Sequence, residues 1–514
     1  MKSILLKIYF FATTLFVFAT AQSQTKEFEN VIQVKLQNTV PVKNNGTIVG
    51  YALFYKVDKL KKAALYRLEI LDENLKSIGS NEFEGSKALE LMDAVYESGH
   101  IMLAFDDPKK VDDYEKYVQV FDLKGKQTGL VSYDPDKVKK GMFGAAVAEQ
   151  MSHYYNGYQN VEGKGFVCVY QSKAKTGGAN VQMLDMNGKL KWEKSFEGAK
   201  GDRMDCYLTA TTPNALLFLT AERNSIMARD AETFLIGLDP NNGKEMYRKP
   251  MKFKDLVWEP MLFKNDVNSG LKMISTLSHA EDKFYTAKPI GMNISALNDR
   301  TGEIILEKNF MFEGDLSKVM NMKNESKSED GFVRIHDITL MPDGSKVFVG
   351  EFFRRTLSVL GVMGKLISHN GSGSASQITI GDMFLLKVDK NNNPVSLEKI
   401  EKNVQRIPLA ADGLPIGLIS RVLALDHNFG YMYTDESSDP NKKTVLARGA
   451  FEGEKYGTNS ITFDSNKGYK QKRFNIEKEK NDEVYIMRGK PGHVLVMKYN
   501  EKKKKISLNL ERID

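Results

Sequence analysis

The sequence contains few cysteines and few tryptophans. Among 514 residues there are 2 Cys and 2 Trp, against 21 Tyr and 28 Phe. Two cysteines form at most one disulfide, so we expect a buried core rather than a disulfide framework to hold the fold. Cys168 and Cys206 lie in adjacent apolar segments, which is compatible either with one disulfide or with two separately buried thiols. Neither belongs to a CxxC pair, and we expect no catalytic thiol.

The chain also lacks a strong excess of either charge. Its formal net charge is +7, or +5 without Lys2 and Lys7, and acidic and basic residues are interspersed. Nucleic-acid-binding domains concentrate positive charge on one face, so we expect no nucleic-acid partner. No segment after residue 21 approaches 18 consecutive apolar residues, so we expect no stable membrane insertion.

The N-terminus has the organisation of a cleaved secretory signal. A basic start is followed by the mostly apolar run Ile4–Phe18 and by the small residues Ala19-Thr20-Ala21. We therefore predict a signal peptide over residues 1–21 and an exported mature chain, periplasmic or secreted. No Cys follows the small residues, which gives no support to a lipid anchor.

Catalytic motifs are absent as well. No GxSxG elbow, SxxK or P-loop stands between a predicted strand and a helix, no HExxH pattern occurs, and the seven histidines are scattered. We predict no cofactor, no dedicated metal site and no assigned catalytic residue, and we favour a protein that is not an enzyme.

A turn phrase, by contrast, recurs along the chain. Two or three apolar residues precede Asp or Asn, then come a polar spacer, often Gly, and a basic residue. The copies are Val120–Lys126, Met183–Lys189 and Gly237–Lys244, with looser ones at Ala296–Glu303 and Lys387–Asn393. Asp accepts backbone N–H bonds two residues on and Gly tolerates positive φ, so the phrase predicts a tight hairpin between the third and fourth strands of a repeat. Asp389–Asn393 resembles the start of a calcium loop, but Pro394 stands where such a loop needs Gly.

The segments between these turns have strand length and are rich in Val, Ile, Phe and Tyr. We predict an all-β fold, a β-propeller of seven or eight four-stranded blades, as a single domain over residues 22–514. Tandem β-sandwich domains are the alternative. Three strands at the chain end would pair with Glu29–Val40 and join the two termini. The predicted inner strands are Leu89–Tyr96, Arg203–Ala210, Phe332–Leu340 and Arg421–Asp426.

The turns carry a resemblance to known propellers. Leu184–Trp192 and Leu238–Lys244 resemble the blade turns of quinoprotein-type propellers, and Met341-Pro-Asp-Gly-Ser-Lys346 is similar to a turn of many bacterial extracellular propellers. As a whole the chain resembles an uncharacterised family of exported proteins from Gram-negative bacteria. The resemblance implies architecture and assigns no activity.

Candidate functional residues lie in the C-terminal half. His336-Asp337 and Asp426-His427 are at or near predicted inner strands, where their side chains would reach the central channel. The full set of candidates for a polar channel mouth is His336, Asp337, Glu351, Arg354, Arg355, Arg421 and His427. Insertions near residues 354–382 and 406–420 would elaborate a binding face.

Three functions fit this pattern. The first is an exported, monomeric scaffold that binds a protein or glycan through loops or the channel mouth. The second is a polysaccharide-active hydrolase or lyase that uses channel carboxylates and a histidine. The third is a structural component of a cell-envelope assembly.

Overall fold

The computed structural model shows an all-β chain whose sheets are the blades of an eight-bladed β-propeller. The chain forms two compact units, unit 1 (residues 1–87 and 477–514) and unit 2 (residues 88–476). The propeller prediction is confirmed with eight blades, and tandem β-sandwich domains are wrong. Among the described residues no helix is long and apolar enough to span a membrane. The structure describes residues 24–36, 39–44, 47–110, 113–133, 157–171, 177–198, 203–224, 230–266, 270–282, 287, 289–317, 319, 332–357, 376–408, 429–435, 441–449, 457–464, 468–474 and 476–513.

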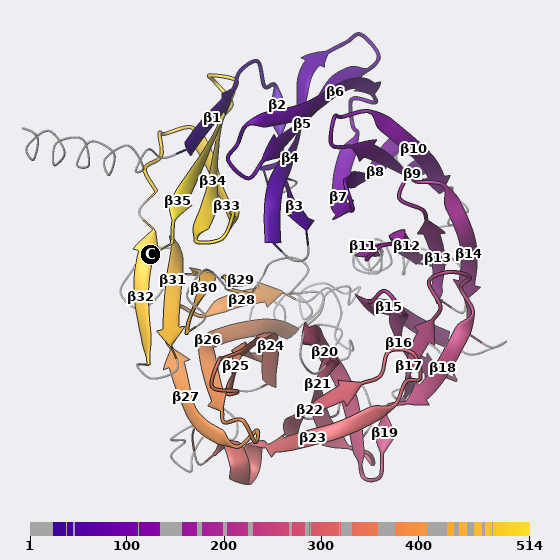
Figure 1. Cartoon of the computed structure of the whole chain (residues 1–514), viewed down its shortest axis with the longest axis vertical. Coiled ribbons are helices and arrows are strands. Elements are labelled where there is room, and N and C mark those ends of the chain that lie inside the picture. The colour runs from indigo at the N-terminus through magenta and orange to yellow at the C-terminus, as the bar shows by residue number, and fades with distance from the viewer. Residues whose placement is uncertain are drawn as a thin grey trace, which may run out of the picture. The chain divides into compact units, whose positions relative to one another are not determined.

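Unit 1 holds two blades (Figure 1). Blade 1 consists of β2 (Gln33–Val34), β4 (Thr47–Lys59), β5 (Ala64–Asp72) and β6 (Ser77–Gly85), with β3 (Val40–Asn44) paired to β4. Blade 8 consists of β33 (Asp482–Arg488), β34 (His493–Asn500), β35 (Lys505–Arg512) and, from the other end of the chain, β1 (Gln24–Phe28).

The strand that joins the two termini was predicted a few residues too late. We expected Glu29–Val40, but β1 ends at Phe28, which pairs with Ile506 and is buried in the apolar cluster between blades 8 and 1. Two residues later Asn30 adopts a φ of 60°, a left-handed conformation that turns the chain out of the sheet. The predicted strands at the C-terminus are confirmed.

Unit 2 holds the remaining six blades. Blade 2 contains β7 (Glu90–Glu97), β8 (His100–Lys110), β9 (Asp113–Asp122) and β10 (Gln127–Tyr133), and blade 3 contains β11 (Gly157–Val161), β12 (Gly165–Gln171), β13 (Ala179–Leu184) and β14 (Leu190–Phe196). Blade 4 contains β15 (Arg203–Thr211), β16 (Leu216–Arg223), β17 (Glu232–Leu238) and β18 (Glu245–Pro250). Blade 5 contains β19 (Lys252–Phe253), β20 (Leu256–Asp266), β21 (Gly270–His279), β22 (Gly291–Leu297) and β23 (Ile304–Met311), followed by the short helical segment η2 (Phe312–Leu316).

The last two blades of unit 2 carry the candidate residues. Blade 6 contains β24 (Phe332–Leu340), β25 (Lys346–Leu357), β26 (Ser376–Val388) and β27 (Pro394–Ile400), with β28 (Gln405–Pro408) paired to β26. Blade 7 contains β29 (Tyr431–Asp435), β30 (Lys442–Gly449), β31 (Gly457–Asp464) and β32 (Tyr469–Phe474). Three predicted inner strands are confirmed as β7, β15 and β24, while Arg421–Asp426 lies outside the described residues. Signal segment 1–21 also lies outside them.

The repeated turn is a hairpin, as predicted. Asp185 Oδ1 accepts the backbone N–H groups of Asn187 and Lys189, both at 2.9 Å. The same pair of bonds forms at Asp72, Asp122 and Asp389. In blades 1 to 6 the turn links the two outermost strands, whereas at Asn500 it links the second and third strands of blade 8, because β1 supplies the fourth.

The glycine of this turn also contacts the preceding blade. Gly243 has a φ of 69°, and a Cβ added there would lie 2.8 Å from the Trp192 ring on outer strand β14. Trp192 Nε1 in turn donates to the Pro240 carbonyl at 2.9 Å. Gly302 approaches the Tyr247 ring of β18 in the same way. Glycine therefore serves both the turn conformation and the docking of one blade on the next.

The two cysteines are free and buried, so the possible disulfide between Cys168 and Cys206 is not formed. Cys168 packs in the cluster between blades 2 and 3, with its Sγ 3.7 Å from Met102 Sδ. Cys206 packs in the cluster between blades 3 and 4. The sheet of blade 3 lies between these clusters, because Cys168 points to one face and its neighbours Val167 and Val169 to the other.

Candidate functional site

Three of the predicted channel-mouth residues meet on the inner side of blade 6. His336 and Asp337 lie on β24, and Glu351 lies on the neighbouring strand β25, where it pairs with Arg334. Figure 1 places β24 toward the inside of unit 2 and β27 toward its outside. Arg354 and Arg355 follow on β25, while Arg421 and His427 lie outside the described residues.

Glu351 is the centre of a buried charged network. Its side chain is fully buried and forms an ion pair with Lys402, whose side chain is 3% exposed. The backbone N–H of Tyr431 donates to Oε1 at 2.7 Å, and that of Gly430 donates to Oε2 at 3.1 Å. Burial alone would raise the pKa of Glu351, but the nearby Lys402 ammonium opposes this effect, and the pKa lies below its ordinary value.

His336 is enclosed beside this carboxylate. Its ring stacks on Tyr431 with centroids 5.0 Å apart and meets Phe429 edge-on at 4.9 Å. Nε2 lies 3.2 Å from Glu351 Oε1, within ion-pair distance, but the approach does not have the angles of a hydrogen bond. Burial lowers the pKa of His336, despite the opposing effect of Glu351, so the ring is neutral at pH 7.

Asp337 connects blade 6 to both neighbouring blades. Lys264 of β20 contacts Asp337 Oδ1 at 2.6 Å, and the Tyr431 hydroxyl donates to Oδ2 at 3.3 Å. Loss of water around Tyr431 and the nearby Asp337 charge raise the pKa of that hydroxyl well above its usual value, so it acts as a donor. These bonds hold the inner strands of blades 5, 6 and 7 together.

A β-bulge places His336 in this network. The pairing of β24 with β25 skips His336, so the strand contains one extra residue between Ile335 and Asp337. The inner strands of blades 2, 4, 5 and 7 have bulges as well. In blade 2 the residue after the bulge is again an aspartate, Asp93. Unlike the buried network of blade 6, Asp93 is exposed to solvent.

The predicted insertions supply strands as well as connections. β25 and β26 extend beyond the blade, and Gln377–Ile380 of β26 pair with Gln405–Pro408 of β28. We call this layer of β25, β26 and β28 the blade-6 extension. One of its faces joins a small apolar cluster of Phe353, Ile378, Ile380 and Phe429 with Phe332 and Ile407.

The other face of the blade-6 extension is polar. Arg354 pairs directly with Thr379, and Thr379 pairs with Arg406, so the three side chains share that face. Both arginines are exposed. Thr356 Oγ1 lies 3.0 Å from Thr379 Oγ1 on the same face. Arg355 instead pairs with Ile378 and points toward the apolar face.

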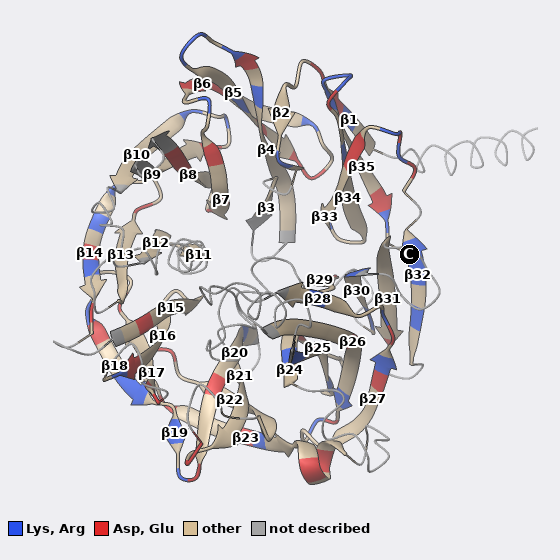
Figure 2. Ribbon diagram, turned by 180° about the vertical axis from the view of Figure 1, so that it is seen from behind, with Lys and Arg blue, Asp and Glu red and all other residues tan. Residues whose placement is uncertain are grey.

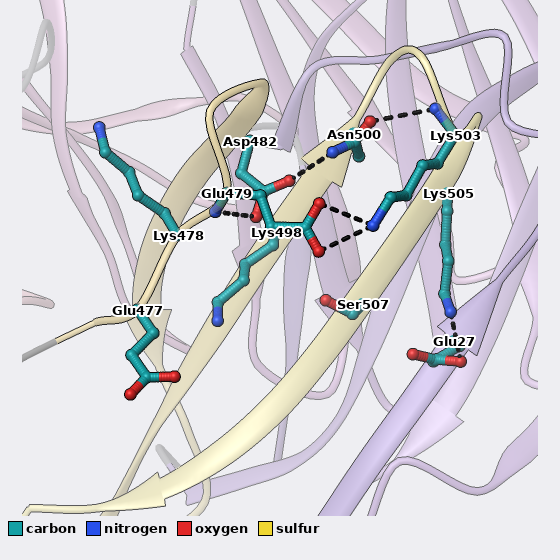
Figure 3. Close-up of a pocket in the computed structure, with 10 residues that line it drawn as sticks. All are labelled: Glu27, Glu477, Lys478, Glu479, Asp482, Lys498, Asn500, Lys503, Lys505 and Ser507. Atoms are coloured by element: carbon teal, nitrogen blue, oxygen red, sulfur yellow. Dashed lines mark hydrogen bonds and ion pairs between the residues drawn. The ribbon is translucent and has the colours of Figure 1, made fainter.

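A separate charged hollow of about 390 Å³ lies in unit 1, on one face of blade 8 (Figure 3). Lys503 pairs with Glu479 at 2.6 Å and Lys505 with Glu27 at 2.7 Å, so its rim is largely neutralised. Small-molecule pockets are mostly apolar with a few placed polar groups. The lining residues here are charged or polar throughout: Glu27, Glu477, Lys478, Glu479, Asp482, Lys498, Asn500, Lys503, Lys505 and Ser507.

Sequence reasoning missed Lys402, Lys264 and Tyr431, which complete the blade-6 network. None of them belongs to a motif, and Lys402 is 51 residues from Glu351. The mixed surface expected from the charge balance is present on the outer strands β14, β18 and β27, each of which carries both basic and acidic residues (Figure 2). Among the described residues no group of three or more His, Cys, Asp or Glu is placed to hold a metal ion.

Comparison with known proteins gives a family and a set of propellers. The model of the "Family of unknown function (DUF6770)" matches residues 1–514. No curated protein matches the sequence. The WD40 domain of SCAP from fission yeast is similar at 9% identity and a TM-score of 0.38, covering 96% of this chain and 95% of that one.

Two further propeller structures are similar. The β-propeller domain of the Trilobed protease from Pyrococcus furiosus shares 10% identity with a TM-score of 0.35, covering 85% of this chain and 97% of that one. Quinohemoprotein alcohol dehydrogenase from Comamonas testosteroni shares 9% identity with a TM-score of 0.29, covering 95% and 76%. At these scores the likeness says nothing about function.

Proposed function

The chain belongs to the Family of unknown function (DUF6770), and we propose that it is an exported, non-enzymatic propeller scaffold that binds an acidic polysaccharide through the blade-6 extension. The observation that carries this proposal is the row Arg354–Thr379–Arg406, which places two exposed arginines on either side of a buried threonine on one face of the sheet. Guanidinium groups recognise carboxylates and sulfates by paired hydrogen bonds.

The composition of this face favours a glycan over a protein. The described side chains on it are Arg354, Thr356, Gln377, Thr379 and Arg406, all polar. A stable protein interface usually has an apolar or aromatic centre, which this face does not offer. Thr379 is buried between the two arginines, but the half-buried Thr356 hydroxyl and Gln377 amide beside two cations suit a polymer that carries both hydroxyls and negative charges.

The buried network supports a binding role over hydrolysis. The alternative function requires a channel carboxylate and a histidine, His336 or His427, that reach a substrate, and His427 lies outside the described residues. Glu351 is fully buried and occupied by Lys402 and two backbone N–H groups, and His336 is enclosed by aromatic rings. Their geometry serves to fix the inner strands that carry the extension.

Binding of polygalacturonate, with dextran as the neutral comparison, tests the proposal. We expect the wild-type protein to retain polygalacturonate and to release it as salt rises, because the contact is ionic. Double substitution Arg354→Gln/Arg406→Gln should weaken this binding at least tenfold. The matched control, Lys191→Gln/Lys244→Gln, removes two exposed charges from blades 3 and 4 and should leave binding unchanged.

The result also separates glycan from protein partners. Equal loss in both double variants would mean that net charge alone attracts the polymer and would contradict the proposed site. Polyglutamate serves as an acidic polypeptide in the same assay. If the protein binds polyglutamate but not polygalacturonate, its partner is an acidic polypeptide and the proposed glycan is wrong. If the protein binds neither polymer, the proposal that the blade-6 extension is a binding site for acidic polymers is wrong.

A further inference from the structure

One face of blade 5 buries polar side chains that have no hydrogen-bond partner among the described residues. Ser275 on β21 and Asn293 and Ser295 on β22 are each fully buried, and neither Ser Oγ nor either amide atom of Asn293 forms a hydrogen bond within the described part of the chain. The same holds for the buried Trp258 Nε1 on β20. Native proteins rarely leave such groups unsatisfied, because each unmade bond costs free energy.

The strand register places these groups side by side. Ser275 pairs directly with Asn293, and Trp258 pairs with Leu277, two residues along β21 from Ser275. Ser295 follows Asn293 by two residues, so it points to the same face. Directly paired side chains in a sheet have Cβ atoms about 5 Å apart and diagonal ones about 7 Å. Leu277 and Met273, on the same face, belong to the apolar cluster between blades 4 and 5.

We infer that this group, which we call the blade-5 polar cluster, binds ordered water inside the protein. The cluster offers both donors and acceptors: the indole N–H donates only, each hydroxyl does both, and the Asn293 amide does both. A buried water typically makes about three hydrogen bonds, which adjacent members of such a set can provide. None of the four side chains is charged, so they would not stabilise a bound ion. A neutral molecule that both donates and accepts hydrogen bonds, such as water, fits them best.

Trp258 offers a direct probe of this water. The chain contains two tryptophans, so Trp192→Phe leaves Trp258 as the single fluorophore. In that background we expect the emission of Trp258 to be red-shifted relative to a dry core tryptophan, and Ser275→Ala/Asn293→Leu to shift it to the blue. Ile294→Val, on the opposite apolar face of β22, is the matched control and should leave the emission unchanged.

A high-resolution crystal structure of the full chain completes the test. We expect water density within hydrogen-bond distance of Asn293 and Ser275, lost in the double variant. Direct pairing of Asn293 with protein groups, without water density, would overturn the inference. Density for a larger molecule in contact with the cluster would overturn it in favour of a small-ligand site. If the double variant fails to fold, the wild-type structure alone decides.

Discussion

Carboxylates at the blade tips and in the interior of blade 6 differ in how far along the sequence their hydrogen-bond partners lie. At the blade tips, aspartates such as Asp185 accept N–H groups from residues two and four positions later. In the interior of blade 6, Glu351 is held by Lys402, Gly430 and Tyr431, which are 51, 79 and 80 residues away. The first kind builds a hairpin from a local phrase. The second ties two blades together.

This contrast predicts that the interior carboxylate matters far more for stability. Removing one partner of a buried ion pair leaves an uncompensated charge. For Glu351→Ala we expect a loss of about 3–5 kcal/mol in unfolding free energy, since Lys402 would remain buried without its partner. Urea unfolding followed by circular dichroism measures the change.

A second variant separates charge from shape at this position. Glu351→Ala/Lys402→Met removes both charges and should recover much of the loss, because a neutral pair does not bear the cost of an unpaired ion. If the single and double variants are equally unstable, packing rather than the ion pair explains the role of Glu351.

Substitution of a turn glycine should cause the next largest loss of stability. Gly243→Ala must accept both a left-handed backbone and a clash with the Trp192 ring. Gly163 has nearly the same φ, 68°, but nothing lies within 4 Å of an added Cβ, so Gly163→Ala is the matched control. We expect the control to cost about 1–2 kcal/mol and Gly243→Ala about 1–3 kcal/mol more. Equal thermal shifts in the two variants would show that the turn does not dock on blade 3.

Loss of a turn carboxylate should have a smaller effect. Asp185→Ala removes two hydrogen bonds to exposed backbone N–H groups, which water can replace. We expect about 1 kcal/mol or less. The shift in urea midpoint should therefore be several times smaller than for Glu351→Ala. A loss as large as that of Glu351→Ala would break the contrast between local and interior carboxylates.

The same contrast explains what could be predicted from sequence. The hydrogen bonds of the repeated turn could be predicted because the donors and the acceptor lie within five residues of one another. The repetition of the turn predicted the blades. His336, Asp337 and Glu351 were recognised as a group from their strands. Lys402, Lys264 and Tyr431 could not be, because only the packing of three blades brings them together. The strand that joins the termini was misplaced, since Phe28 is selected by a cluster formed from both ends of the chain.

The smallest expected effect is a change in pH dependence at His336. Burial lowers the pKa of His336 in the folded protein, so the unfolded chain binds a proton first as the pH falls below about 6.5. The contribution of neutral His336 to the free energy of unfolding is therefore complete above pH 6.5. It decreases as the pH falls toward the pKa that His336 has in the folded protein. His336→Gln should make the free energy of unfolding less dependent on pH in this window.

The other titrating group of the network acts in a separate pH range: Glu351 has a lowered pKa, so its contribution changes only below its ordinary value near 4.5. Urea midpoints measured at pH 7.5, 6.5 and 5.5 for wild type and His336→Gln test this directly. Parallel profiles would mean that His336 titrates alike in the folded and unfolded chain, which its enclosure by Tyr431 and Phe429 argues against.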